Sequence, residues 1–386
     1  MVFGGGKKRS CQSRGEYMRG NKVVWYIVIS ILCIIFLEVF SWMFLKVYIR
    51  HSKKINGDVS LTQYWEFDPY LIWIPKNKVE GYDSYSNYKM NNYGFRNSYD
   101  IAKEKAPGSF RIIVLGGSTA WGSGASSNDT VWTAVLENIL RRHSGKTVEV
   151  LNAACGGYTS FQELMYLEFK LLQFSPDMVI VLDGYNDIFM DALYPGDKYE
   201  ANVSVSYYDE KKFFESGLLW QISGLILSRS NFCSLIRRAG EKIKYETGRS
   251  LYGRGYVHTK GIDNYISNIQ SIAGLLKGRN IKTMFLLQPY LAISKKQLSP
   301  EEESMLSKNR QASAYMIPLM ELLREKYKQF ASKNALNYYD LTDICDDSPR
   351  SETMWYDHAH LNDNGNKVLA EKLGNILIKD DNHRSN

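Results

Sequence analysis

The stretch RIIVLGGSTAWGSG, residues Arg111 to Gly124, decides the fold that we expect for this chain. Its first half is a continuous apolar run, which is typical of a strand covered on both faces of a sheet. Its second half is rich in glycine and serine, as in turns that follow a strand and either cradle a phosphate or present a nucleophile. Motifs elsewhere in the chain distinguish between these two functions.

Four similar apolar runs follow, and amphipathic helical patterns lie between them. The runs are 148–153 (VEVLNA), 178–184 (MVIVLDG), 283–288 (TMFLLQ) and 338–343 (YYDLTD). This alternation predicts α/β architecture: a five-stranded parallel sheet with helices on both faces, in one domain at 108–380. The interval from Asp187 to Lys282 is too long for one crossover helix, so we expect an insertion at about 188–262.

Local signals predict where several helices begin. The cluster Asn128-Asp129-Thr130 is expected to cap the helix that follows it, and Ser160 with Glu163 reads as a capping box for the next. Inside the insertion, FFESGLLWQISGLIL (213–227) has an amphipathic helical pattern, but its apolar run is too short to span a membrane.

The N-terminal region carries a membrane signal. Val23 to Leu45 is apolar except for Ser30, Glu38 and Ser41, and a helix of this length spans a hydrocarbon core of about 30 Å. It is longer than the apolar region of a cleaved signal peptide. Six basic residues precede it and four follow, which favours a cytoplasmic N-terminus at 1–22 and places the rest in the periplasm or outside the cell.

The net charge of +7 belongs to this region and not to the body. Up to Lys54 there are ten basic and two acidic residues, whereas the remainder holds 38 basic and 39 acidic ones. A nearly neutral body lacks the electrostatic footprint of a nucleic-acid binder, so we expect the bilayer and not nucleic acid as a partner. Nothing in the sequence identifies a protein partner.

Two further features of the body concern its packing and its cysteines. Residues 46–107 have few apolar runs, and we expect a juxtamembrane lead-in segment that packs on the domain without forming its core. Cys155, Cys233 and Cys345 show no metal-ligand spacing, and an oxidising compartment permits one disulfide among them at most. We predict no metal and no cofactor.

The phosphate interpretation of the opening stretch fails on its residues. A P-loop needs a lysine after its second glycine, and Ser123 stands there. The dinucleotide pattern GxGxxG also lacks its third glycine. The turn is therefore expected to present a nucleophile.

Four polar segments follow strands of the predicted sheet. Ser118 follows the first strand, NAACGGYTS (152–160) the second, GYND (184–187) the third, and DHAH (357–360) comes after the fifth. Ligands bind at the carboxyl ends of the strands in an open parallel sheet, so all four segments are expected to meet at one edge.

Their residue types suit acyl transfer. The Ser118 hydroxyl needs a base, His360 can take its proton, and Asp357 can fix the histidine tautomer. An anionic intermediate also needs donors, which the N–H groups of Ser118 and Gly157 and the amide of Asn186 can supply. His358 is the weaker candidate for the base. Each residue also has a plain structural alternative, such as a turn serine or a helix-capping asparagine.

This set of motifs resembles the SGNH hydrolases, the GDSL-type esterase and lipase family. The resemblance covers about Tyr93 to Ile378 and implies a flavodoxin-like three-layer fold with a Ser-His-Asp mechanism. NNYGFRN (91–97) and LLQPYLAISKKQLSPEE (286–302) are similar to segments of a membrane-anchored bacterial branch. One departure is Gly117, where the family's GDS motif has aspartate, and it puts the geometry of the turn in question.

The predicted function is a membrane-anchored serine esterase that hydrolyses O-acetyl or other O-acyl esters, with envelope glycans as the expected substrates. The alternatives are an O-acyltransferase acting on a polysaccharide and a non-catalytic glycan-binding scaffold.

Overall fold

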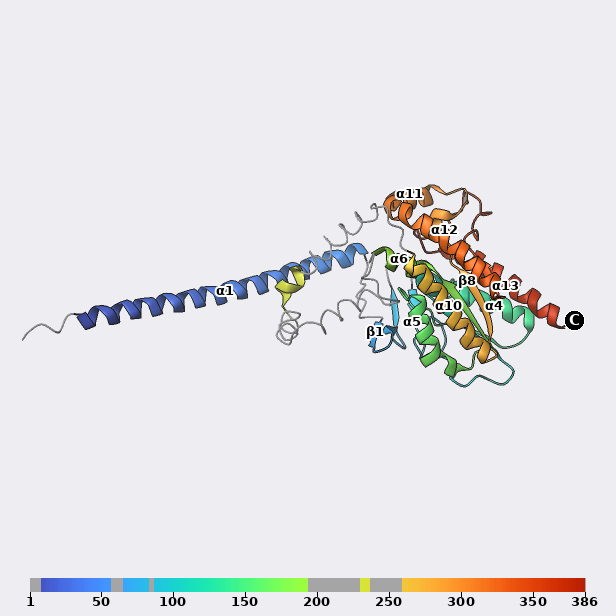
Figure 1. Cartoon of the computed structure of the whole chain (residues 1–386), viewed down its shortest axis with the longest axis horizontal. Coiled ribbons are helices and arrows are strands. Elements are labelled where there is room, and N and C mark those ends of the chain that lie inside the picture. The colour runs from blue at the N-terminus through green and yellow to red at the C-terminus, as the bar shows by residue number, and fades with distance from the viewer. Residues whose placement is uncertain (1–7, 57–64, 83–86, 194–229, 237–258, 386) are drawn as a thin grey trace, which may run out of the picture. The chain divides into compact units, whose positions relative to one another are not determined.

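The computed structural model describes residues 8–56, 65–82, 87–193, 230–236 and 259–385 (Figure 1). They form two compact units: a long N-terminal helix with residues 230–236, and an α/β unit that holds the rest. Most of the expected insertion, including the helix predicted at 213–227, lies outside the described residues.

The first unit contains the predicted membrane segment. Helix α1 runs from Lys8 to Asn56, and Val24–Val47 is the one stretch among the described helices that is long and apolar enough to cross a membrane. The carboxylate of Glu38, which interrupts this stretch, accepts hydrogen bonds from the Ser230 hydroxyl and from the Asn231 backbone N–H, the latter at 2.8 Å. A second segment of the chain therefore pairs with the acidic residue of the apolar helix.

The second unit is built on a parallel sheet of five strands in the order β6-β5-β7-β8-β9. The strands are β5 (Phe110–Gly116), β6 (Val148–Asn152), β7 (Met178–Asp183), β8 (Lys282–Leu287) and β9 (Tyr338–Asp340). Counted from β5, the order is 2-1-3-4-5, the flavodoxin-like arrangement, in which the order reverses between β5 and β7. The predicted fold class and all five predicted strands are confirmed.

Helices cover both faces of the sheet and make three layers (Figure 1). One face carries α5 (Ser160–Tyr166), α6 (Tyr185–Leu193), α10 (Lys260–Gly278) and α12 (Arg310–Lys333). The other carries α4 (Trp132–Ser144) and α13 (Asp363–Ser385), while α11 (Pro300–Lys308) contacts α12. Side chains of β5 alternate between two cores: Ile113 and Leu115 enter one, Ile112 and Val114 the other.

Two helix starts differ from the sequence prediction. The N-cap of α5 is Thr159, which forms a capping box with Gln162, so the predicted box was one residue too late. The N-cap of α4 is Val131, and the Trp132 N–H donates instead to Asn366 Oδ1 of α13 at 3.1 Å. At α4, a tertiary contact therefore supplies the acceptor that a local cap was expected to provide.

The lead-in segment contributes to the core, which corrects the expectation that it would pack outside it. It forms two antiparallel hairpins, β1 (Trp65–Asp68) with β2 (Ile72–Pro75) and β3 (Glu80–Tyr82) with β4 (Asn87–Lys89). Phe67 and Tyr70 stay exposed, but other apolar residues of the segment are buried in the two cores: Leu71, Tyr88, Met90, Phe95 and Ile101. The segment is polar on average, so its composition did not indicate that individual residues belong to the core.

Candidate active site

Ser118, His360 and Asp357 meet at the carboxyl end of the sheet. Ser118 begins the short helix α3 (Ser118–Trp121), which follows β5 directly. His360 Nε2 lies 2.8 Å from Ser118 Oγ, and His360 Nδ1 lies 2.8 Å from Asp357 Oδ2. With Asp357 accepting from Nδ1–H, Nε2 is left to accept the serine proton. The arrangement is that of a base-activated hydroxyl.

A tight turn holds Asp357 and His360 in place. Asp357 Oδ1 accepts the N–H groups of Ala359 at 2.8 Å and His360 at 2.9 Å. The turn is closed at its base by a bridge between Trp355 and Leu361. The DxxH spacing thus lets one carboxylate oxygen fix the backbone while the other orients the imidazole.

Asp357 is charged over the whole neutral and mildly acidic range. Burial by itself raises the pKa of its carboxyl, but the hydrogen bond and charge of His360, with the Ala359 N–H, outweigh burial and lower the pKa to about 2. An ionised carboxylate beside the imidazole stabilises the imidazolium that forms when His360 takes a proton.

The expected oxyanion donors Gly157 and Asn186 lie on the loops that follow the two strands flanking β5. Gly157 lies in the loop after β6, and Asn186 lies in the first turn of α6, after β7. Asn186 Nδ2 donates to the Tyr158 carbonyl at 2.7 Å, which uses one of the two N–H groups of its amide. Ser118, Gly157 and Asn186 are each partly exposed, whereas Leu115, Thr119 and Asp187 beside them are buried.

Gly157 occupies a backbone conformation that suits glycine. Its φ is +80°, in the left-handed region, and a Cβ there would lie 3.4 Å from the indole of Trp73. The conformation turns the chain between β6 and α5, and the Tyr158 carbonyl of this loop lies beside Gly117, the residue before Ser118.

Arg96 supports the nucleophile turn and was not singled out by sequence reasoning, although it lies in the NNYGFRN motif. It is 2% exposed, its Nη1 donates to the Gly122 carbonyl at 2.7 Å, and its guanidinium lies 4.1 Å from the centre of the Trp121 ring. Its Nε also donates to Asn128 Oδ1 at 3.3 Å. These contacts fix the end of the helix that Ser118 begins.

Thr119 joins the nucleophile turn to the histidine loop. Its hydroxyl donates to the Ala359 carbonyl at 3.2 Å and accepts from Gln288 Nε2 at 3.1 Å. Because Ala359 precedes His360, this contact sets the distance between serine and base.

Two tryptophans of the β1–β2 hairpin border the Gly157 loop, and sequence reasoning missed both. The Trp73 indole N–H donates to the Gly156 carbonyl at 3.3 Å, and a Cβ on Gly156 would lie 3.6 Å from the Trp65 ring. Both indoles are half-buried. The lead-in segment thereby supplies a wall beside a candidate oxyanion donor.

Two residues considered at the sequence level stand apart from the nucleophile contact. His358 Nε2 lies 3.4 Å from the Tyr185 hydroxyl, so His360 and not His358 contacts Ser118. Cys155 is buried, and burial raises the pKa of its thiol well above the usual range, as expected for a packed residue. Cys33, Cys155, Cys233 and Cys345, the cysteines whose side chains are described, are all free thiols.

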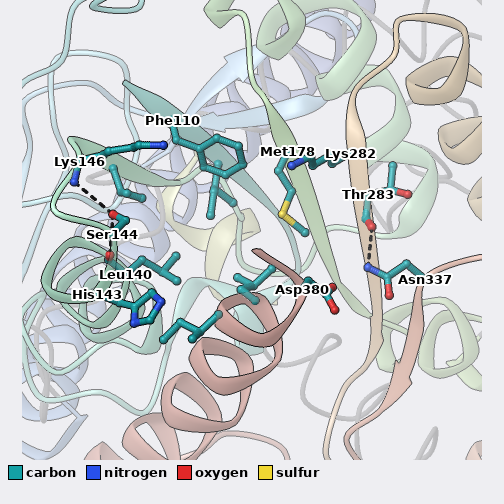
Figure 2. Close-up of a pocket in the computed structure, with 14 residues that line it drawn as sticks. Phe110, Leu140, His143, Ser144, Lys146, Met178, Lys282, Thr283, Asn337 and Asp380 are labelled. Carbon is teal, nitrogen blue, oxygen red and sulfur yellow. Dashed lines mark hydrogen bonds between the residues drawn. The ribbon is translucent and has the colours of Figure 1, made fainter. Parts of the chain in front are cut away.

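A pocket of about 480 Å³ lies at the opposite edge of the sheet (Figure 2). It is lined by residues at the beginnings of the strands, among them Phe110, Val148, Met178 and Lys282, together with α4 and α13. It includes no residue of the candidate active site.

A model of the GDSL-like Lipase/Acylhydrolase family matches residues 114–368, which include all five candidate site residues. No curated protein matches the sequence. Among solved structures, the chain is similar to a GDSL-like lipase from Bacteroides thetaiotaomicron (12% identity, covering 72% of this chain and 92% of that one, TM-score 0.38). It is also similar to an acetylxylan esterase from Geobacillus stearothermophilus (13% identity, 68% and 92% coverage, TM-score 0.38). Because the family model covers more than half of the chain, the chain belongs to the GDSL-like lipase/acylhydrolase family of carboxylic ester hydrolases.

Proposed function

We propose that this protein is a membrane-anchored serine esterase that cleaves O-acyl esters through an acyl-enzyme. One observation carries the proposal: a single imidazole contacts both Ser118 Oγ and the Asp357 carboxylate, each at 2.8 Å. Ser118, Asp357 and His360 are the proposed catalytic residues, and Ser118, Gly157 and Asn186 provide the proposed oxyanion donors.

The first half of the reaction transfers the acyl group to the protein. Ser118 Oγ attacks the ester carbonyl carbon while His360 Nε2 takes the hydroxyl proton. The carbonyl oxygen becomes an anion that the backbone N–H groups of Ser118 and Gly157 and the Asn186 amide stabilise. As the tetrahedral intermediate collapses, the bond to the alkoxy oxygen breaks and His360 gives that oxygen its proton.

The second half releases the acid. Water, deprotonated by His360, attacks the acyl-serine carbonyl, and the same donors receive the new oxyanion. When the bond to Ser118 Oγ breaks, the serine recovers its proton from His360. Asp357 stays ionised in both halves, because its pKa is lowered to about 2 despite burial, mainly by the hydrogen bond and charge of His360.

The location of the protein suggests its substrate. We infer that Val23–Leu45 spans the bilayer with residues 1–22 in the cytoplasm, so that the α/β unit faces the periplasm or the exterior. Anchored there, the enzyme would meet the acylated glycans of the cell envelope at high local concentration. An O-acetylated envelope glycan is therefore the proposed substrate class.

The test is turnover by the full chain in detergent micelles. p-Nitrophenyl acetate, butyrate and octanoate are offered first, then an O-acetylated oligosaccharide, with Ser118→Ala as the control. Ester cleavage that disappears in the variant, with free acetate released from the oligosaccharide, supports an esterase. Acetate moved onto an acceptor sugar instead would make the protein an O-acyltransferase, and folded protein without turnover would contradict both.

A further inference from the structure

Asp187 makes a contact that local sequence does not explain. It lies in the first turn of α6, yet its carboxylate binds the start of α5: Oδ1 accepts the Ser160 hydroxyl at 2.6 Å and Oδ2 accepts the Ser160 N–H at 3.1 Å. Asp187 is 1% exposed, and Ser160 is fully buried. The carboxylate therefore connects the start of α6 to the start of a different helix.

This contact joins the two loops that carry the candidate oxyanion donors. Gly157 lies three residues before Ser160, and Asn186 directly precedes Asp187. The strands that lead into these loops, β6 and β7, are not neighbours, because β5 with Ser118 runs between them. Without a tie, the two loops would be positioned independently on either side of the nucleophile.

A second tie runs parallel to the first. Asn186 Nδ2 donates to the Tyr158 carbonyl at 2.7 Å, next to Gly157. The bond holds the Asn186 amide against the same loop that Asp187 holds through Ser160. The two loops are thus joined twice, by Tyr158 and Ser160 on one side and by Asn186 and Asp187 on the other.

Capping of α5 alone does not require Asp187. The first turn of that helix already has a complete capping box, with the Thr159 side chain bound to the Gln162 N–H and the Gln162 side chain bound to the Thr159 N–H. Asp187, which belongs to α6, binds the next residue, Ser160. Its contact therefore connects α6 to α5 and is not needed to cap α5.

The surroundings of the Asp187 carboxylate oppose its ionisation. The carboxyl groups of Glu163 and Asp183 are buried nearby, and Tyr265 donates to Asp183 Oδ1 at 2.5 Å. Burial, together with the charge of Asp183, raises the pKa of Asp187 to about 7. The compensating donors are the two groups of Ser160, whose hydroxyl in turn accepts from Asn268 Nδ2 of α10 at 2.9 Å.

Only a carboxylate fits both donors of Ser160. Its two oxygens accept from the hydroxyl and the N–H together, whereas an amide offers one oxygen and would turn its NH₂ toward one of the donors. A buried donor without an acceptor destabilises the folded protein, so we expect an amide at position 187 to make the loops shift.

We propose that Asp187 is a positioning residue that sets the separation of the Gly157 and Asn186 donors by binding Ser160 across the nucleophile strand. The proposal rests on the proposed function, since it assigns a role within the same oxyanion site. It predicts that loss of the Asp187 carboxylate weakens transition-state binding more than substrate binding.

The experiment compares Asp187→Asn with Asp177→Asn in the full chain in detergent. Asp177 is a matched control at the other end of β7: its carboxylate also binds a backbone N–H, that of Arg111 at 2.7 Å, but at the amino-terminal edge of the sheet. Each variant is measured for kcat and KM on p-nitrophenyl acetate, for the rate of fluorophosphonate labelling of Ser118, and for its melting temperature.

We expect Asp187→Asn to lower kcat by about 10- to 100-fold, somewhat less than deletion of an oxyanion donor, with KM changed less than about threefold. The labelling rate falls in proportion. Asp177→Asn keeps its kcat within about twofold even if it melts earlier. Ser160→Ala removes one of the two donors to Asp187, so its kcat should lie between those of Asp187→Asn and the wild type. The double variant should have a kcat only slightly below that of Asp187→Asn.

Wild-type kcat in folded Asp187→Asn, or an equal loss in Asp177→Asn, would overturn the inference while leaving the esterase assignment intact. If Ser118 of the wild type is neither labelled nor needed for turnover, the proposed function fails and the role of Asp187 falls with it.

Discussion

Gly117 lies against the side-chain amide of Asn186: a Cβ placed on Gly117 would come within 2.4 Å of Asn186 Nδ2. No side chain fits there unless the amide moves, because real Cβ contacts are never this short. The glycine that replaces the aspartate of the GDS motif is therefore matched to the position of Asn186 in this chain. The geometry of the turn, which the sequence put in question, leaves room for glycine alone beside the candidate donor Asn186.

Gly117→Ala tests this match. The added methyl group displaces the Asn186 amide, and we expect kcat on p-nitrophenyl acetate to fall by about 10²-fold, near the loss for removing one oxyanion donor. Asn186→Ala should lose a similar amount, and the double variant should lose little more than either alone, since both remove the same donor. Multiplicative losses in the double variant would show that Gly117 acts by another route.

Asp357→Asn tests the orientation of the imidazole. The amide cannot accept from His360 Nδ1–H and also keep its NH₂ away from the Ala359 and His360 N–H groups, so the tautomer and ring position are lost. We expect kcat to fall by about 10³–10⁴-fold with KM nearly unchanged. Steady-state kinetics at pH 8 measure this. A loss below tenfold would mean that Asp357 is not the orienting partner of His360.

Arg96→Lys tests the support of the nucleophile turn. An ammonium cannot donate to the Gly122 carbonyl and to Asn128 while covering the Trp121 ring, because it lacks the planar fork of a guanidinium. We expect a loss of about 2–3 kcal/mol in stability, seen as a lower melting temperature, with a reduced kcat even at temperatures where the protein is folded. The surface variant Arg350→Lys is the control, and equal melting of Arg96→Lys and wild type would contradict the role.

The buried acids predict how stability depends on pH. Burial and the charge of Asp183 raise the pKa of Glu163 well above its ordinary value. A carboxyl whose pKa is higher in the folded than in the unfolded chain stabilises most fully below the unfolded pKa of about 4, and this contribution is lost as the pH rises toward the folded pKa. The slope is at most about 1.4 kcal/mol per pH unit for each proton.

We therefore expect the melting temperature of the wild type to fall between pH 5 and pH 8. Glu163→Gln cannot ionise, so its melting temperature should depend less steeply on pH. Glu352→Gln, a substitution of an exposed acid, serves as the control. Parallel curves for Glu163→Gln and wild type would show that Glu163 does not carry this dependence.

The sheet and the candidate catalytic residues were predictable because their signals are local. Each strand is an uninterrupted apolar run, as in 178–184, and parallel topology brings the ends of such runs to one edge. Each candidate site residue follows a strand or lies in a short motif, so the fold class predicts that these residues lie at one edge of the sheet: Ser118, Gly157, Asn186, Asp357 and His360.

Contacts between distant side chains could not be predicted in this way. The segment TSFQE (159–163) fits two overlapping capping boxes, Thr159 with Gln162 and Ser160 with Glu163, and the contact from Asp187 to Ser160 accompanies the first register. Arg96 and Trp73 come from a polar segment without periodicity, and only their place in the fold shows that they border the site.

The most direct test of the central claim is fluorophosphonate labelling of the full chain, followed by peptide mapping of the modified residue. An activated serine reacts, whereas an ordinary turn serine does not. Our account predicts modification at Ser118, absent in Ser118→Ala and slowed at least about 10³-fold in His360→Ala. Modification at another residue, or none in folded wild-type protein, would contradict the assignment of Ser118 as a nucleophile activated by His360.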